Sequence, residues 1–509
     1  MPNPAPMKPP QIKVALLWGK SRFRLRSRRP FRITEAGEKT HLFCAGEAEF
    51  TLIRVSLAQK QRWLWIGNGS EENVADRLAP MLRSGGITTA LLPVGLTPIS
   101  NRWKARQHRI LIRPENGDWE SLQSRLQEIQ PTNTGTYVEI PDGLSEGNVR
   151  ILRADGGQME LKPPFELDSE EVVDLLDAPV GEGFHWQHTE KLELPPPIWI
   201  AVGSDGKLCA GVRLEVEDYL TSVNSSEMPA ESPLEFLKAQ VVAARSWLLA
   251  NWGSHHPGEP YTVCGGDHCQ CYYGTTRIAA SSREAAEMTS GEVLMYNGCI
   301  CDARYAKSCG GVTEPAANVW AHTNEPYLGH IRDLPAGAAL DLSDEMRFRA
   351  FQQRRVGADA CCSPGFVPLT GKLDELSRLY RWEESISAEA LRDNIRRKTG
   401  LDLGRIEALI LSRRGPSGRL IELEIAGQDG RLRVAPELVI RRALSPNHLP
   451  SSAFWVERSA NGDFLFHGLG WGHGVGMCQI GAAALAVQGL LYPRILEHYY
   501  PNTSLEKIY

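Results

Sequence analysis

The first part of the chain has the two-residue hydrophobic period of β-strands. Residues 12–18 are almost entirely apolar, and Arg22-Phe23-Arg24-Leu25-Arg26 alternates strictly. Alternation puts the arginines on one face of a strand and the apolar side chains on the other. The arginine face fits either an anion-binding surface or, more commonly, the solvated face of a half-buried sheet. We therefore predict that residues 11–57 are strands.

The pattern changes between residues 58 and 145. Val74, Leu78 and Leu82 recur at the four-residue spacing of a helix, between short apolar runs typical of strands. The predicted order is strand, helix, strand, strand, helix, strand, at 63–66, 72–82, 87–94, 109–112, 119–129 and 138–140. This order predicts a small ferredoxin-like layer. In element order and length it resembles the SPOR type of glycan-binding domain.

The remaining pattern predicts a mixed fold. Residues 150–216 return to strands and turns, and a long helix begins near Leu234, with a second helical region over 340–400. Residues 405–457 alternate like strands, 466–479 form a Gly-rich loop, and a last helix runs over 481–500 with breaks at Gly489 and Pro493. We predict an α+β fold with a strand-rich core, one long helix and a small β-α-β-β-α-β domain.

Charge and hydrophobicity argue against nucleic-acid binding and against a transmembrane segment. The net charge is −5, so a strongly cationic surface for nucleic acid is not expected. No run of about 18 apolar residues exists, so we expect no transmembrane segment. The apolar run 14–18 is shorter than the ~7–15 residues of a secretory signal core, and we expect no signal peptide in this chain.

Arg245 stands out on the long helix. Leu237, Val241 and Leu248 share one helical face, and Arg245 falls on the same face. An unpaired guanidinium on an apolar stripe is costly. Glu227, in what we predict to be the loop before the helix, is the partner or neighbour that the sequence suggests.

Cysteine and histidine cluster in the next segment. The chain has 11 cysteines, and the cluster comprises His255, His256, Cys264, His268, Cys269 and Cys271. Such density favours a zinc site over its alternatives, a disulfide within the turn or buried free thiols. Cys299, Cys301 and Cys309 could supply a further ligand or pair with each other, and Cys361-Cys362 stands apart.

Several motifs in a fixed order resemble the stage II sporulation protein D (SpoIID) family, which includes LytB-type amidase enhancers. The motifs are Glu217-Asp218-Tyr219-Leu220, Ser226-Glu227-Met228-Pro229, 237–246, Cys269-Gln270-Cys271-Tyr272, 305–313, Glu325-Pro326-Tyr327-Leu328, 470–482 and His498-Tyr499-Tyr500-Pro501. The resemblance covers roughly 150–509, and 12–18 resembles the family's first strand. It implies a division into N-terminal strands (11–57), the SPOR-like insertion (58–145), a catalytic region (150–333) and a C-terminal region (334–509).

The resemblance implies a lytic transglycosylase that cleaves the glycan strands of peptidoglycan, with Glu227 as its single catalytic acid and base. One carboxyl suffices because the sugar's own C6 hydroxyl replaces water as the nucleophile. A close Arg245 would favour the ionised carboxylate, whereas a general acid must carry its proton. Either burial outweighs that effect or Arg245 points at substrate.

The resemblance also implies further site residues. Zinc is expected on His256, Cys264 and Cys269, with His268 and Cys271 in reserve. The expected substrate-binding residues are Arg245, Gln240, Ser308, His473 and Gln479. His473 fits a hydrogen-bonded core histidine equally well. Cys309 and Cys478 stand where the family usually has hydroxyl residues.

Two other functions stay open. One is a non-enzymatic glycan binder that enhances a cell-wall amidase, as the LytB type implies. The other is a cytosolic metal-binding protein, which the expected lack of an export signal would favour. The resemblance itself implies a location in the cell envelope.

Overall fold

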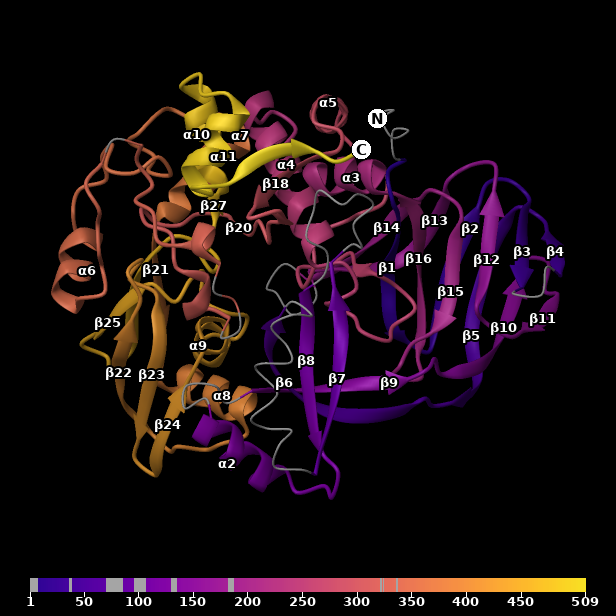
Figure 1. The fold of residues 1–509 in the computed structure, drawn as a ribbon, viewed down its shortest axis with the longest axis horizontal. Coiled ribbons are helices and arrows are strands. Elements are labelled where there is room, and N and C mark those ends of the chain that lie inside the picture. The colour runs from indigo at the N-terminus through magenta and orange to yellow at the C-terminus, as the bar shows by residue number, and fades with distance from the viewer. Residues whose placement is uncertain are drawn as a thin grey trace.

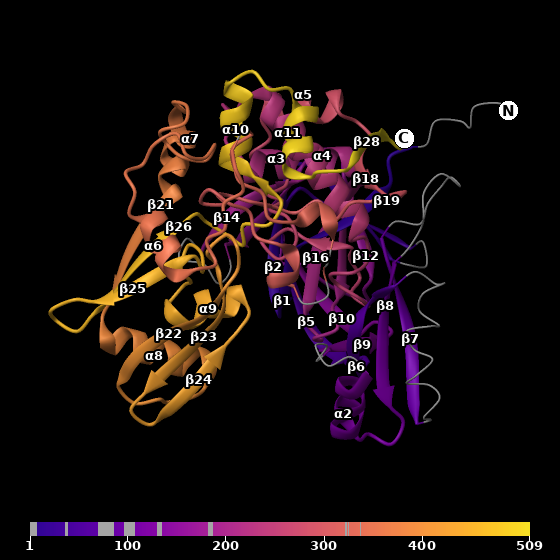
Figure 2. The same cartoon turned by 60° about the vertical axis from the view of Figure 1, so that its left-hand side comes forward.

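The computed structural model describes residues 8–35, 39–69, 86–95, 107–129, 135–181, 187–320, 323, 325–335 and 337–509. The fold is α+β, as predicted. In Figures 1 and 2 a group of helices lies above two large sheets on one side and the C-terminal strands on the other. Within the described residues, no helix is both long and apolar enough to span a membrane.

Two large, mostly antiparallel sheets form the N-terminal half. The first has the order β17 (Val263–Cys264), β1 (Gln11–Lys20), β16 (Leu208–Glu215), β15 (Ile198–Val202), β12 (Phe165–Ser169), β3 (Phe31–Glu35) and β4 (Thr40–Phe43). The second has the order β11 (Gln158–Leu161), β10 (Glu146–Arg153), β5 (Gly46–Ser56), β2 (Arg22–Ser27), β13 (Val173–Val180) and β14 (His188–Leu194). Phe50 of the second sheet contacts Phe165 of the first, with ring centroids 6.4 Å apart. The two sheets therefore share one core.

The alternating arginines of β2 lie on the solvated face. Residues along β2 alternate between exposed and buried, and Arg24 pairs with Glu47 at 2.9 Å and with Asp177 at 2.5 Å. Because neighbouring carboxylates neutralise these guanidinium groups, the exposed face of a half-buried sheet accounts for the pattern.

The segment 58–145 builds its own sheet. The strands β6 (Gln59–Gly69), β7 (Ile87–Val94), β8 (Gln107–Pro114) and β9 (Thr136–Asp142) pair antiparallel in the order β7-β8-β6-β9, with α2 (Trp119–Ile129) on a separate small core. This order is the one that the predicted β-α-β-β-α-β unit requires. The predicted helix 72–82 lies outside the described residues. Ser56 of β5 pairs with Glu146 of β10, so the segment leaves and re-enters the second sheet at one point.

A group of helices surrounds the long predicted helix α4 (Leu234–Ala250). Its neighbours are α3 (Val216–Glu227), α5 (Ala280–Met288), α10 (Gln479–Val487), α11 (Tyr492–Tyr499) and the sheet of β18 (Glu292–Tyr296), β19 (Cys299–Ile300) and β28 (Ser504–Lys507). Residues 236–249 of α4 are all buried. A helix that is covered on every side is the centre of its layer.

A buried ion pair joins α3 to α4. Arg245 has no exposed surface, and its Nε and Nη2 donate to the two carboxylate oxygens of Glu217 at 2.8 and 2.6 Å. Arg245 Nη1 donates to the Glu292 carbonyl at 2.9 Å, and the Tyr509 hydroxyl donates to Glu217 at 2.6 Å. The pair thus connects two helices, β18 and the C-terminal residue.

The C-terminal part differs from the prediction in two places. Its elements are α6 (Glu345–Gln352), α7 (Gly371–Ser377), β21 (Arg381–Ile386), α8 (Ala388–Thr399), β22 (Ile406–Arg414), β23 (Leu420–Gly427), β24 (Gly430–Val434), α9 (Glu437–Leu444), β25 (Phe454–Arg458) and β26 (Phe464–Leu469). Short 3-10 helices occupy Ala316–Asn318, Pro326–Leu328 and Arg378–Tyr380. The predicted helical region 340–400 is broken by β21, because β21 pairs with β26, which lies far along the chain. The predicted strand region 405–457 contains the helix α9, whose Glu437 and Arg441 pair one turn apart at 3.2 Å.

We expect Arg245→Ala to lower the free energy of unfolding by about 3–5 kcal/mol, because it leaves Glu217 without its charge partner inside the protein. Arg245→Lys should recover only part of this loss, since an ammonium cannot reproduce the two-pronged contact. Urea unfolding followed by circular dichroism measures both. Arg283→Ala, on the exposed face of α5, is the control and should change stability by less than about 0.5 kcal/mol. Equal stability of Arg245→Ala and Arg283→Ala would contradict this account.

Candidate functional site

Glu227 is the last residue of α3 rather than part of a loop, which corrects the prediction. Its side chain is half-buried. The Cys271 backbone N–H donates to Glu227 Oε1 at 3.2 Å, and Lys307 Nζ donates to the Glu227 carbonyl at 2.9 Å. Among the residues that the structure describes, Glu227 makes no ion pair. The carboxyl is therefore held in place by a neutral donor.

The suggested pairing of Arg245 with Glu227 is wrong. Arg245 binds Glu217, which lies ten residues before Glu227 on the same helix. Arg245 is fully buried and joins two helices, and its predicted contact with substrate stays a prediction. The guanidinium that would have favoured an ionised Glu227 is thus paired with Glu217 instead.

Four side chains in the Cys/His segment converge as a possible metal centre. One ligand atom from each of His256, Cys264, His268 and Cys269 lies within 4.8 Å of the other three. His256 Nε2 is 3.3 Å from Cys269 Sγ, which is 3.8 Å from His268 Nδ1. We call these four residues the tetrad. Two thiols and two imidazoles are the donor set of a tetrahedral structural zinc site.

The tetrad contains all three expected ligands and one of the two in reserve. His268 belongs to it, whereas the Cys271 thiol donates to Asp267 at 3.6 Å. A hydrogen bond from Cys269, helped by His256 and His268, lowers the pKa of the Cys264 thiol. All 11 cysteines lie in the described residues and are free thiols. Two imidazoles beside two thiols are donors that a metal ion needs, so the residues of the tetrad fit a metal site.

The loop of the tetrad also holds the candidate acid. Cys269 belongs to the tetrad, and two residues later the Cys271 N–H contacts Glu227. Between them, Gln270 accepts a hydrogen bond from Tyr219 of α3 at 3.1 Å and donates one to the Tyr305 hydroxyl at 3.1 Å. An ion on the tetrad would fix this loop and, through it, the position of the Glu227 carboxyl.

Two polar residues beside Glu227 were missed by the sequence analysis. Lys307 contacts the Glu227 carbonyl. Loss of hydration, and then the charge of Glu227, raise the pKa of Asp267, which places a second carboxyl in the surroundings of the first. Lys307 lies inside a quoted motif and Asp267 next to His268, but a single polar residue in a loop has no periodicity to reveal its role.

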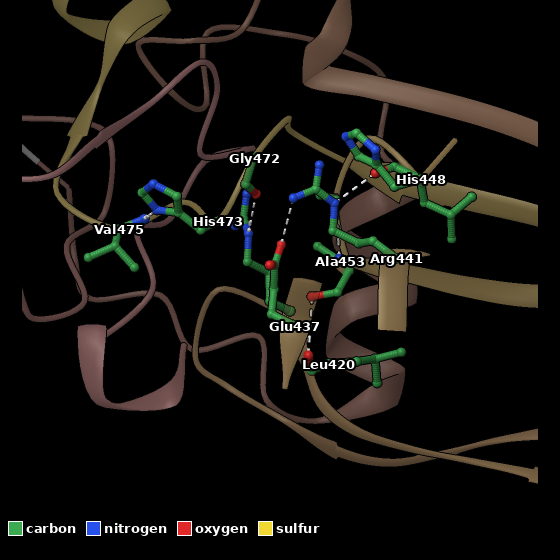
Figure 3. Close-up of polar contacts among 12 residues, drawn as sticks. Leu420, Glu437, Arg441, His448, Ala453, Gly472, His473 and Val475 are labelled. Atoms are coloured by element: carbon green, nitrogen blue, oxygen red, sulfur yellow. Dashed lines mark hydrogen bonds and ion pairs between the residues drawn. The ribbon is translucent and has the colours of Figure 1, made fainter. Parts of the chain in front are cut away.

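The Gly-rich loop between β26 and β27 (Met477–Cys478) supplies His473, which Figure 3 shows beside Val475. Gly474 and Gly476 have φ angles of 72° and 70°, and a Cβ atom on Gly476 would lie 1.9 Å from the Arg304 carbonyl. These glycines therefore serve tight turns and close backbone contacts. The Val475 N–H donates to His473 Nδ1 at 3.0 Å. Burial, and then the charge of Arg304, lower the pKa of His473 well below its usual value, so its imidazole is neutral at pH 7.

The other predicted substrate-binding residues lie inside the protein. Gln479 of α10 donates to Gln240 of α4 at 3.2 Å, and both side chains are buried. Ser308 is fully buried, and its hydroxyl has no hydrogen-bond partner among the described residues. The structure thus brings Gln240 and Gln479 together but away from the surface, and their contact with substrate stays a prediction.

Comparison with known proteins adds independent evidence. The family model described as "Stage II sporulation protein" matches residues 204–296, which include Glu227 and the tetrad. A second model, described as a domain of unknown function (DUF8618), matches residues 314–476.

Three relatives align with somewhat more than half of the chain. The amidase enhancer of Bacillus subtilis is 29% identical over 56% of this chain, but the alignment covers only 40% of that protein. Stage II sporulation protein D of Bacillus subtilis is 25% identical over 58% of this chain and 75% of its own length. An uncharacterized protein of Brachyspira hyodysenteriae is 27% identical over 57% of this chain and 67% of its own length. The model match over residues 204–296 and the likeness to these relatives support an assignment of the chain to the SpoIID/LytB family.

Proposed function

We propose that the protein cleaves the glycan strands of peptidoglycan as a lytic transglycosylase and that Glu227 is its catalytic acid and base. The observation that carries the proposal is the state of the Glu227 carboxyl. It is half-buried, oriented by the Cys271 N–H and, among the described residues, without an ion pair. A carboxyl with this freedom can both give and accept a proton.

The reaction needs one carboxyl and no water. Glu227 donates its proton to the oxygen of the glycosidic bond, the C1–O bond breaks, and one glycan end leaves as an alcohol. The Glu227 carboxylate then removes the proton of the sugar's C6 hydroxyl while O6 bonds to C1, which closes a 1,6-anhydro ring. Glu227 is protonated again at the end. A hydrolase would need a second carboxylate to activate water or act as the nucleophile.

The tetrad fits zinc in a structural role. His256, Cys264, His268 and Cys269 supply four protein ligands, which leaves no open position for a substrate. When bound, zinc would supply a cross-link within the loop. The chain's own contribution is the Cys271 N–H, which orients Glu227. Because peptidoglycan lies outside the membrane, we propose a location in the cell envelope.

A second candidate function is enhancement of a cell-wall amidase without glycan cleavage. The printed name of one relative, "Amidase enhancer", favours it. In this case the protein would bind glycan strands and raise the activity of the amidase. Glu227 would then take no part in a chemical step. The two functions therefore differ in whether Glu227 is needed.

We expect Glu227→Gln to lower the rate of glycan cleavage by about 10²–10⁴-fold, because an amide cannot transfer the proton. The measurement is the release of anhydro-muropeptides from purified peptidoglycan and from denuded glycan strands, followed by mass spectrometry. Glu284→Gln, on the exposed face of α5, is the matched control and should leave the rate unchanged.

An equally active Glu227→Gln protein would contradict the mechanism. If neither the wild type nor Glu227→Gln cleaves glycan, but both stimulate a cell-wall amidase to the same extent, the enhancer function is the correct one.

Removal of the metal should act through the loop. We expect Cys264→Ser to lose zinc, to melt a few degrees lower and to cleave glycan more slowly, because the Cys271 N–H no longer holds Glu227 in one place. Zinc content, thermal unfolding and cleavage rate are measured on the same preparation. Cys209→Ser, a buried cysteine outside the tetrad, is the control. If a zinc-free Cys264→Ser protein has an unchanged melting temperature and an unchanged cleavage rate, metal on the tetrad does not hold the Glu227 carboxyl in position.

A further inference from the structure

A second group of potential ligands lies away from the tetrad, in the interior. Cys309, Asp333, Cys362 and Cys478 each offer one atom within 4.8 Å of the other three, and all four are buried. Cys309 follows β20 (Tyr305–Ala306), Cys478 ends β27, and Cys362 lies in the segment between α6 and α7. The sequence suggests Cys299 and Cys301 as companions of Cys309, whereas the structure places Cys362 and Cys478 there.

The spacing of the sulfur atoms fits one tetrahedral ion. Two thiolates about 2.3 Å from a tetrahedral zinc ion lie about 3.8 Å apart, and Cys309 Sγ is 3.7 Å from Cys362 Sγ. A disulfide between Cys309 and Cys362 would need about 2.05 Å between the sulfurs. It would also leave the thiol of Cys478 without a bonding partner in the group. An iron–sulfur cluster binds its ligands at different iron atoms, which spreads them further apart than this group allows.

The buried carboxyl of the group also lacks a cationic partner among the described residues. Asp333 has no exposed surface, and it has no ion-pair partner in the part of the chain that the structure describes. Its carboxylate accepts from the Tyr499 hydroxyl at 2.6 Å and from the Cys362 backbone N–H at 2.9 Å. An isolated buried carboxylate is costly, and buried charges are paired or coordinate metals.

The surroundings of the group resemble the outer shell of a metal site. The Cys309 backbone N–H donates to Cys478 Sγ at 3.2 Å, and the Gly311 N–H donates to Cys309 Sγ at 3.4 Å. In metal sites, hydrogen bonds of this kind orient the residues that bind the ion. The contact of Tyr499 with Asp333 would act in the same way. Gly481 leaves the necessary room, because a Cβ atom there would lie 2.3 Å from the Tyr499 hydroxyl oxygen and 2.6 Å from Asp333 Oδ1.

We propose that Cys309, Cys362, Cys478 and Asp333 bind a second zinc ion. Three sulfur ligands select zinc over the hard cations magnesium and calcium. The ion joins four separate segments of the chain, among them β27 and the residues that follow its partner strand β20. The loop of His473 ends in β27, so the ion stabilises the base of the Gly-rich loop, just as an ion on the tetrad would stabilise the loop that orients Glu227. The proposal is independent of whether the protein cleaves glycan.

Metal content of the full chain tests the proposal. The wild type, purified with zinc and dialysed, should contain about two zinc ions per chain. Cys264→Ser, which disrupts only the tetrad, should keep about one, and Cys362→Ser should also keep about one. Cys361→Ser is the matched control, because Cys361 is the buried neighbour outside the group, and it should keep about two.

The sulfur count at the remaining ion distinguishes the sites without relying on one variant. X-ray absorption of zinc in Cys264→Ser should show about three sulfur neighbours and one oxygen or nitrogen neighbour, against the two sulfurs of the tetrad. Asp333→Asn should weaken retention of that ion against a chelator while the protein stays folded by circular dichroism.

Three results would overturn the proposal. The first is a wild-type content of one zinc ion or none. The second is a protein mass lower by two hydrogens than that of the fully reduced chain, with the disulfide located among the three cysteines. The third is bound iron together with sulfide. If Cys362→Ser fails to fold, the wild-type content and the sulfur count in Cys264→Ser still decide the question.

Discussion

The buried pair of Arg245 and Glu217 is the constraint on which the geometry of the site depends. It fixes α3 against the central helix α4, and through Tyr509 and the Glu292 carbonyl it also fixes the C-terminal residue and β18. Glu227 is the last residue of α3, so its position follows from that of the helix. The same pair keeps the guanidinium away from Glu227, which leaves the carboxyl free of a permanent counter-charge.

Two loops carry predicted site residues, and each contains or adjoins cysteines of one of the two ligand groups. The loop of the tetrad brings the Cys271 N–H to Glu227, and the Gly-rich loop carries a neutral His473 whose Nδ1 is already occupied by the Val475 N–H. Loops without regular secondary structure have few hydrogen bonds of their own to hold them. A metal ion on the tetrad would make the loop that orients Glu227 rigid, and proton transfer at a defined distance requires such rigidity.

Local periodicity predicted many of the elements well. The strand 87–94 and the helix 119–129 were predicted with the bounds that the structure shows, because glycines flank the apolar strand and the helix has a regular apolar period. The tetrad was largely predicted because its residues lie close in sequence. The strand β21 and the partner of Arg245 were not predicted, since pairing with β26 and with Glu217 depends on contacts between distant segments. The group of Cys309, Cys362 and Cys478 was missed for the same reason.

The central claim is that the sugar's own C6 hydroxyl, and not water, attacks C1 when the glycosidic bond breaks with the help of Glu227. Cleavage of glycan strands in water enriched in oxygen-18 tests it most directly, with mass spectrometry of the new ends. The account predicts 1,6-anhydro ends that carry no heavy oxygen and weigh one water less than hydrolysis products. Reducing ends that contain the heavy oxygen would contradict it, because they would show that water had attacked C1.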